Sequence, residues 1–189
     1  MDGRPEFIVV PGAWHGPESF EPTTGLLEKA GFTVHGVSLP CVGADPPLPS
    51  FEPDVRAITD VLERVLSSGK DVVLVMHSGD AVNPVNPRDI FYNDLSDDAA
   101  APHVWALRQH SYLAFASTLT AAPWKTVPST YVLCEADHAI PLPVQEGMIA
   151  AAKEAAPSAF DVVERCGAGH SPFLSRPDWL ADRLAESAR

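Results

Sequence analysis

Three residues of this sequence have the side chains that nucleophilic catalysis needs. Ser78 has a hydroxyl that can attack a carbonyl carbon, His170 has an imidazole that can take the hydroxyl proton, and Asp137 has a carboxylate that can orient the imidazole. A serine hydroxyl attacks poorly without such a base, and the base works best when a buried carboxylate holds it in place. The three residues together predict a hydrolytic triad.

Each of these residues follows a stretch with the apolar pattern of a buried strand. The expected strands cover residues 71–76, 130–134 and 160–163. Because parallel strands end at the same edge of a sheet, we expect the serine, the aspartate and the histidine to meet there. Taken singly, the same residues could be a turn serine, a helix N-cap and a histidine in an ordinary glycine loop. Their order along the chain favours the triad.

Backbone N–H groups that could stabilise an oxyanion are offered by two loops. The stretch Pro11-Gly-Ala-Trp-His-Gly16 follows the first expected strand, and its glycines would let the chain turn sharply and aim the N–H of Ala13 inward. The N–H of Gly79, directly after the nucleophile, is the second candidate. The alternative for the first loop is a simple Pro-Gly turn.

Other groups have the right chemistry for a pocket or a metal. The candidate lining of an apolar substrate pocket is Trp14, His15, Trp105, Phe115 and Trp124, although aromatic residues of this kind as often serve only packing. His77, Asp80 and Asp137 with His138 show no metal-ligand spacing, so we expect no metal site. Cys134 lies in an expected strand and fits a small core residue.

The elements that must position these residues alternate between strands and helices. Strands are expected at 7–10 and 32–39 and helices at 26–30, 53–66, 144–156 and 179–187, in addition to the strands named above. This alternation predicts an α/β fold, with a mostly parallel sheet covered by helices on both faces. Residues 1–189 would form one domain, in which the helical, alanine-rich region 89–125 is a small cap over the C-terminal edge of the sheet.

One connection in this pattern is missing. Parallel strands need a crossover of about a dozen residues or more, usually a helix. The residues after Met76 are His-Ser-Gly-Asp-Ala-Val-Asn-Pro-Val-Asn-Pro87, which cannot form one. Either the sequence joins two segments that a longer chain keeps apart, or the elements are truly deleted. We favour the first, because losing a central strand would expose core edges.

Composition narrows the class of protein. The chain has 189 residues, a formal charge of −12 and 46% hydrophobic residues, which suits one acidic globular domain. A basic face for nucleic acid is not expected, and no apolar run reaches the roughly 20 residues of a membrane span. The N-terminus lacks the pattern of a signal peptide, and the three cysteines are odd in number and show no CxxC spacing. Both features predict a cytoplasmic protein. The oligomeric state stays open, a homodimer included.

Several segments resemble the α/β-hydrolase superfamily, in particular the branch of plant methylesterases, hydroxynitrile lyases and their bacterial and fungal relatives. They are FIVVPGAWHG from Phe7, His77-Ser78, FYND from Phe91, Ala122-Pro-Trp-Lys, YVLCEADHAIP from Tyr131 and GAGHSPFLSRP from Gly167. The resemblance implies a cofactor-free serine hydrolase with the triad and oxyanion residues named above. It also implies that the nucleophile helix and the following strand are absent from this chain.

Differences within that branch favour ester hydrolysis. The lyases place Thr where this chain has Gly12 and Lys where it has Ser171, so the charge that would stabilise departing cyanide is missing. The nucleophile motif Gly-x-Ser-x-Gly is altered to Met76-His-Ser-Gly-Asp80. The sequence therefore predicts a hydrolase of small carboxylic esters or lactones. The alternatives are other carbonyl chemistry on the same fold, such as C–C cleavage or cyclisation, and a non-catalytic binding protein with a degenerate motif.

Overall fold

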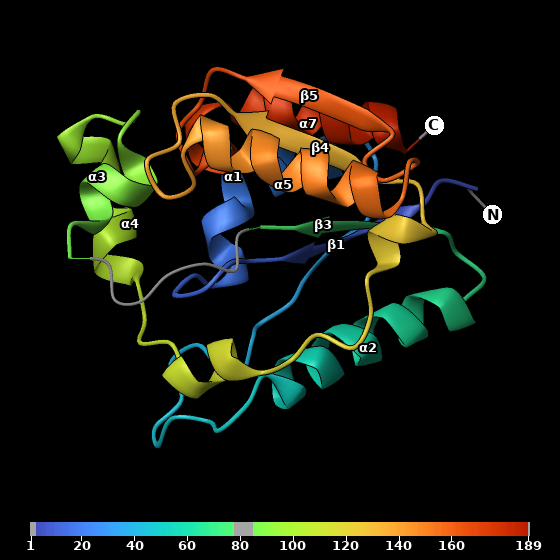
Figure 1. Cartoon of the computed structure of the whole chain (residues 1–189), viewed down its shortest axis with the longest axis horizontal. Helices are drawn as coiled ribbons and strands as arrows, with labels where there is room; N and C mark the ends of the chain where they lie inside the picture. The colour runs from blue at the N-terminus through green and yellow to red at the C-terminus, as the bar shows by residue number, and fades with distance from the viewer. Residues whose placement is uncertain (1–2, 78–84, 189) are drawn as a thin grey trace.

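The computed structural model describes residues 3–77 and 85–188, and its strands form two parallel sheets (Figure 1). The first sheet has the order β2-β1-β3, and the second pairs β4 with β5. The bounds are β1 Glu6–Val10, β2 Val34–Gly36, β3 Val72–Met76, β4 Thr130–Cys134 and β5 Val162–Cys166. Every pairing between them is parallel, as the alternation of strands and helices predicts.

Helices cover both faces of the first sheet because the apolar run of β1 is buried on both. Ile8 and Val10 pack with Val65 of α2 (Glu52–Ser67). Phe7 packs with Leu27 of α1 (Glu21–Lys29) on the opposite face, where α7 (Pro177–Ser187) also lies. In Figure 1, α2 lies below β1 and β3, and α7 lies above them. The predicted fold class is confirmed.

The two sheets pack against the same apolar cluster, but no strand of one is hydrogen-bonded to a strand of the other within the described residues. Val75 of β3 and Val132 of β4 both pack against the cluster of Val9, Phe20, Phe173 and Leu180. Within residues 3–77 and 85–188, β3 and β4 are not hydrogen-bonded neighbours, and Met76 at the end of β3 is 68% exposed. These unpaired edges agree with the expected loss of the strand that follows the nucleophile helix.

The expected bounds of one helix and two strands are wrong. The helix expected at 26–30 is α1, which begins five residues earlier at Glu21. The strand expected at 160–163 is β5, which begins at Val162, because Phe160 has the left-handed φ of 50° and belongs to the preceding turn. The strand expected at 32–39 is shortened to β2, since only Val34–Gly36 pairs with β1. Strand ends depend on which backbone groups find a partner, and this is not visible in a local apolar pattern.

The region 89–125 is only partly helical. α3 (Pro87–Tyr92) and α4 (Asp97–Ala106) stand at the end toward which the strands point (Figure 1). The short helices η2 (Tyr112–Ala116) and η3 (Pro123–Lys125) follow. η3 does not cover that end, because Trp124 stacks on Phe160 with ring centroids 6.0 Å apart, beside the start of the second sheet. The remaining helices are η1 (Pro17–Phe20), α5 (Leu142–Ala155) and α6 (Pro172–Ser175).

Cys41, Cys134 and Cys166 are free and buried. No helix among the described residues combines the length and the hydropathy that crossing a membrane requires. Within the same residues, no three His, Cys, Asp or Glu side chains are grouped so that they could hold a metal ion.

Candidate active site

Asp137 and His170 meet at the ends of β4 and β5. The Nδ1 of His170 lies 3.1 Å from Oδ1 and 3.0 Å from Oδ2 of Asp137. Both side chains are buried, with exposed fractions of 4% for the histidine and 6% for the aspartate. Asp137 Oδ1 also accepts the backbone N–H groups of Ala139 and Ile140, at 2.7 and 2.9 Å. The backbone of the turn after β4 therefore fixes the carboxylate independently of its hydrogen bond to the imidazole.

This arrangement sets the tautomer of His170. A carboxylate can only accept hydrogen bonds, so the Nδ1 of His170 carries the proton and its N–H donates a hydrogen bond to Asp137. In the neutral ring Nε2 is then unprotonated and can act as a base. The two loops are also joined through their backbones, because the N–H of Ala136 donates to the carbonyl of Ala168 over 3.0 Å. The pair has the geometry of an orienting acid and a general base.

The predicted nucleophile Ser78 and the oxyanion candidate Gly79 lie outside the described residues. The residue before them, His77, lies beside His170. His77 Nε2–H donates to the backbone carbonyl of His170 over 2.9 Å, and the two rings have centroids 4.7 Å apart. Burial lowers the pKa of His77 well below its usual range, so its ring is neutral at pH 7. The end of β3 thus reaches the loop of the base.

The loop after β1 is shaped by an unusual backbone conformation. Trp14 has a φ of 66°, in the left-handed region that a bulky residue rarely adopts, and the His15 N–H closes the turn onto the carbonyl of Gly12. The neighbouring N–H of Ala13 donates to no acceptor within the described part of the chain, although Ala13 is buried. An oxyanion site uses backbone N–H groups of this kind, which have no acceptor among the described residues.

The buried imidazole of His15 holds this loop to α3. Its Nδ1–H donates to the carbonyl of Ala13 over 2.7 Å, and its Nε2 accepts the hydroxyl of Tyr92 over 2.8 Å. Burial lowers the pKa of His15 to about 4, so both hydrogen bonds are made by a neutral ring. His15 therefore supports the loop, and it also lines a small cavity together with Trp14 and Tyr92.

The low pKa of His15 predicts that acid destabilises the fold. The unfolded chain keeps the usual value of 6.5, so between pH 6.5 and 4 the unfolded state binds a proton that the folded state does not. Stability should fall as the pH drops through this window, by a contribution on the order of 3 kcal/mol from this residue.

Urea unfolding at pH 7 and pH 4.5 measures this effect. His15→Gln should show a smaller difference in unfolding free energy between the two pH values than the unsubstituted protein. The residual difference belongs to the other histidines whose pKa is lowered by burial, which are His77, His103 and His110. An identical pH dependence in the two proteins would contradict the assignment.

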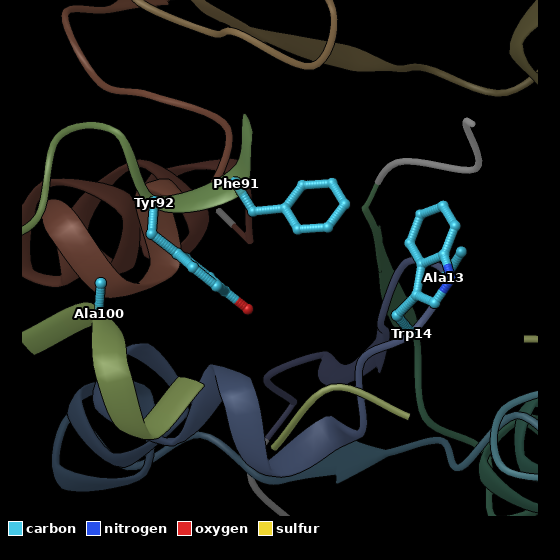
Figure 2. Packing of buried hydrophobic residues seen from close by; sticks show 5 residues of the cluster. All are labelled: Ala13, Trp14, Phe91, Tyr92 and Ala100. Atoms are coloured by element: carbon cyan, nitrogen blue, oxygen red, sulfur yellow. The ribbon is translucent and has the colours of Figure 1, made fainter. Parts of the chain in front are cut away.

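The expected aromatic lining is only partly assembled. Trp14 lies with its ring centroid 5.5 Å from that of Phe91 and 6.1 Å from that of Phe115. Figure 2 shows Phe91 and Tyr92 extending from α3 toward the loop of Ala13 and Trp14. Trp105 is 87% exposed on α4, and Trp124 packs at the opposite end of β4. The structure therefore brings neither of these two tryptophans to the site.

Phe91 and Tyr92 are not among the site residues that the sequence motifs predict. The ring of Phe91 lies 5.5 Å from that of His170, and Tyr92 is fully buried. The signal that could have found them is the segment FYND, which carries the family resemblance although no catalytic group belongs to it.

A comparison with known proteins assigns the chain to a family. The model of a family described as "Alpha/beta hydrolase family" matches residues 7–79 and 80–183. The chain belongs to the alpha/beta hydrolase family. The two matched stretches meet directly after Gly79, where the sequence predicts that a crossover helix is missing.

Relatives and solved structures show the same relation over nearly the whole chain. The alpha/beta hydrolase nvfD of Aspergillus novofumigatus is 28% identical over 247 residues, covering 98% of this chain and 97% of that protein. An alignment longer than the 189 residues of this chain means that the relative has residues without a counterpart here. The methylesterase MES16 from Arabidopsis has a TM-score of 0.79 at 20% identity, covering 97% of this chain and 98% of its own. Polyneuridine aldehyde esterase has a TM-score of 0.77 at 16% identity, covering 98% and 100%. The predicted family and fold are confirmed.

Proposed function

We propose that this hydrolase cleaves small carboxylic esters or lactones through Ser78, His170 and Asp137. The observation that carries the proposal is the buried hydrogen bond between the Nδ1 of His170 and the carboxylate of Asp137. It leaves Nε2 as a base, and His77 ties the end of β3 to the same loop. Ser78 follows His77 directly, which is the position of a nucleophile at the C-terminal end of a strand.

The chemistry would proceed through an acyl-enzyme. The Ser78 hydroxyl attacks the ester carbonyl while His170 Nε2 takes its proton, and the negative oxygen is stabilised by the N–H groups of Ala13 and Gly79. His170 then gives the proton to the departing alcohol. In the second half, His170 removes a proton from water, the water attacks the acyl-enzyme, and Ser78 is released with its proton restored.

The choice of esters as substrates has two supports. Two of the similar solved structures are named a methylesterase and an esterase. Ser171, at the position where the resembling lyases have lysine, is fully buried and uncharged. A cation that could stabilise a departing anion is therefore not supplied by this position. We propose that the triad needs no cofactor, and that α3 and α4 form part of a cap over the site.

Labelling with a fluorophosphonate tests the nucleophile. Intact-mass measurement should show one covalent adduct, which peptide mapping assigns to Ser78. An unlabelled mass above 20.2 kDa would show that a longer chain keeps the two segments apart, and a mass of 20.2 kDa would show a true deletion. Ser78→Ala should remain unlabelled. Ser50→Ala is the matched control, because Ser50 lies in the loop before α2 and should not affect labelling.

The outcomes separate the proposed function from its alternatives. An adduct together with turnover of p-nitrophenyl acetate supports an ester hydrolase. An adduct without turnover of any ester or lactone in a panel would favour C–C cleavage or cyclisation. No adduct would contradict the serine mechanism and favour a binding protein.

A further inference from the structure

The turn that follows α3 contacts both loops of the acid–base pair. The side-chain N–H of Asn93 donates to the carbonyl of Ala136, the residue directly before the orienting acid, over 2.8 Å. The carboxylate of Asp94 accepts the backbone N–H of Gly169, the residue directly before the base, over 2.6 Å. Two consecutive side chains thus hold the backbone on both sides of the pair.

The contact with Gly169 is so close that a Cβ at this position would displace side-chain atoms of the turn. A Cβ at this position would collide with Asn93 Oδ1 and would lie 2.8 Å from Asp94 Oδ1 and 3.0 Å from its Cγ. Ordinary Cβ contacts in proteins are 3.4 Å or longer. The loop of the base therefore lies directly against this turn, with no space for a side chain between them.

The turn is itself anchored, so it can serve as a fixed support. The guanidinium of Arg88 donates to the carbonyl of Leu95 over 2.9 Å and to the carboxylate of Asp97 over 2.7 Å. The hydroxyl of Tyr92 is bound to His15 on the loop after β1. Arg88 and Tyr92 belong to α3, which lies beside the ends of the second sheet (Figure 1). The backbone on either side of Asp94 is therefore anchored, while the Asp94 carboxylate itself accepts the N–H of Gly169.

We propose that Asp94 is a positioning residue for His170. This rests on the proposed function, in which the imidazole of His170 activates Ser78. The loop before His170 contains Gly167 and Gly169, so its backbone has great freedom unless it is held. A charged acceptor makes a stronger hydrogen bond to a backbone N–H than a neutral one. The carboxylate of Asp94 fixes Gly169, and through it the position of the imidazole opposite Asp137.

Loss of this acceptor should slow the chemical step rather than substrate binding. A displacement of about 1 Å in a catalytic group costs about 100-fold in rate. Asp94→Ala should therefore lower kcat for p-nitrophenyl acetate by about 10- to 100-fold, with KM within about twofold. Asp94→Asn keeps an acceptor oxygen and should retain kcat within about threefold. Asp98→Ala removes an exposed carboxylate from the first turn of α4 and is the matched control, with wild-type kcat and KM.

A second measurement reads the geometry without turnover. The proton on His170 Nδ1, held by Asp137, should give a downfield NMR resonance in the unsubstituted protein, and His170→Ala assigns it. Asp94→Ala should broaden or shift this resonance, whereas Asp94→Asn and Asp98→Ala should leave it in place. Gly169→Ala tests the contact from the other side, because its Cβ pushes the turn away and should also disturb the resonance.

The results separate this role from simple stabilisation and from the proposed function. Thermal unfolding of each variant shows that the assay temperature lies below its Tm. A folded Asp94→Ala protein with wild-type kcat and an unchanged resonance would overturn the role of Asp94. If Asp94→Ala does not fold, a wild-type kcat and resonance in Gly169→Ala would do the same. If the unsubstituted protein neither hydrolyses esters nor reacts with a fluorophosphonate, the proposed function fails, and the resonance still decides the role of Asp94.

Discussion

Replacing His170 with alanine should lower kcat/KM for p-nitrophenyl acetate by at least about 10⁴-fold, because Ser78 loses the imidazole that takes its proton. The fold should survive, since Asp137 keeps its hydrogen bonds to the N–H groups of Ala139 and Ile140. Ser78→Ala should be equally inactive. The double variant should be no worse than either single one, because the two residues act as one unit. Initial rates over a range of substrate concentrations measure the effect.

A matched control removes a histidine elsewhere. His35 on β2 is 27% exposed and pairs with Glu6 at 2.7 Å, on the part of the first sheet that does not reach the site. His35→Ala should keep kcat/KM within about twofold of the unsubstituted protein, although it loses a hydrogen bond to Glu6 worth about 1 kcal/mol. Wild-type turnover by His170→Ala would show that the mechanism is wrong.

Replacing Asp137 with asparagine should lower kcat by about 10⁴-fold near pH 7, although the side chain keeps its shape. The reason lies in the turn after β4. The N–H groups of Ala139 and Ile140 donate to Oδ1 of Asp137. In the variant they hold the amide oxygen there, so that the NH₂ group faces His170. The imidazole must then accept at Nδ1 and carry its proton on Nε2, which removes the base.

Asp60→Asn is the control for this substitution, because Asp60 is an exposed residue of α2. It should keep the kcat and KM of the unsubstituted protein. The KM of Asp137→Asn should change little, since the substitution alters a tautomer and not a surface that binds substrate. A loss of less than about tenfold in kcat would mean that Asp137 does not orient the base.

Much of the candidate site could be predicted because it depends on patterns within short segments of the sequence. The apolar run of β1 indicates a strand buried on both faces, and the structure packs Phe7 and Ile8 on opposite helices. Asp137 and His170 each follow an apolar stretch, and parallel strands must end at one edge. Their meeting therefore needed no knowledge of distant contacts. The break behind Ser78 was equally visible, because two prolines in a short stretch exclude a crossover helix.

What could not be predicted depends on contacts between distant parts of the chain. Trp105 and Trp124 are residues of a type that often lines apolar pockets. Trp105 is nevertheless exposed to solvent, and Trp124 stacks on Phe160. Only the path of the chain decides which aromatic residue faces the site. The same is true of Tyr92, whose hydroxyl reaches His15 across 77 positions of sequence.

The sequence by itself determined the fold class, the order of the acid and the base, and the point at which the family's nucleophile helix is missing. These properties follow from residue type, spacing and the ends of strands, which are read along a single segment. The tertiary structure alone decided the tautomer of His170, the neutral state of His15 and the support of the Gly169 loop by Asp94. Each of these requires a donor and an acceptor, or a charge and its burial, that only folding brings within hydrogen-bond distance.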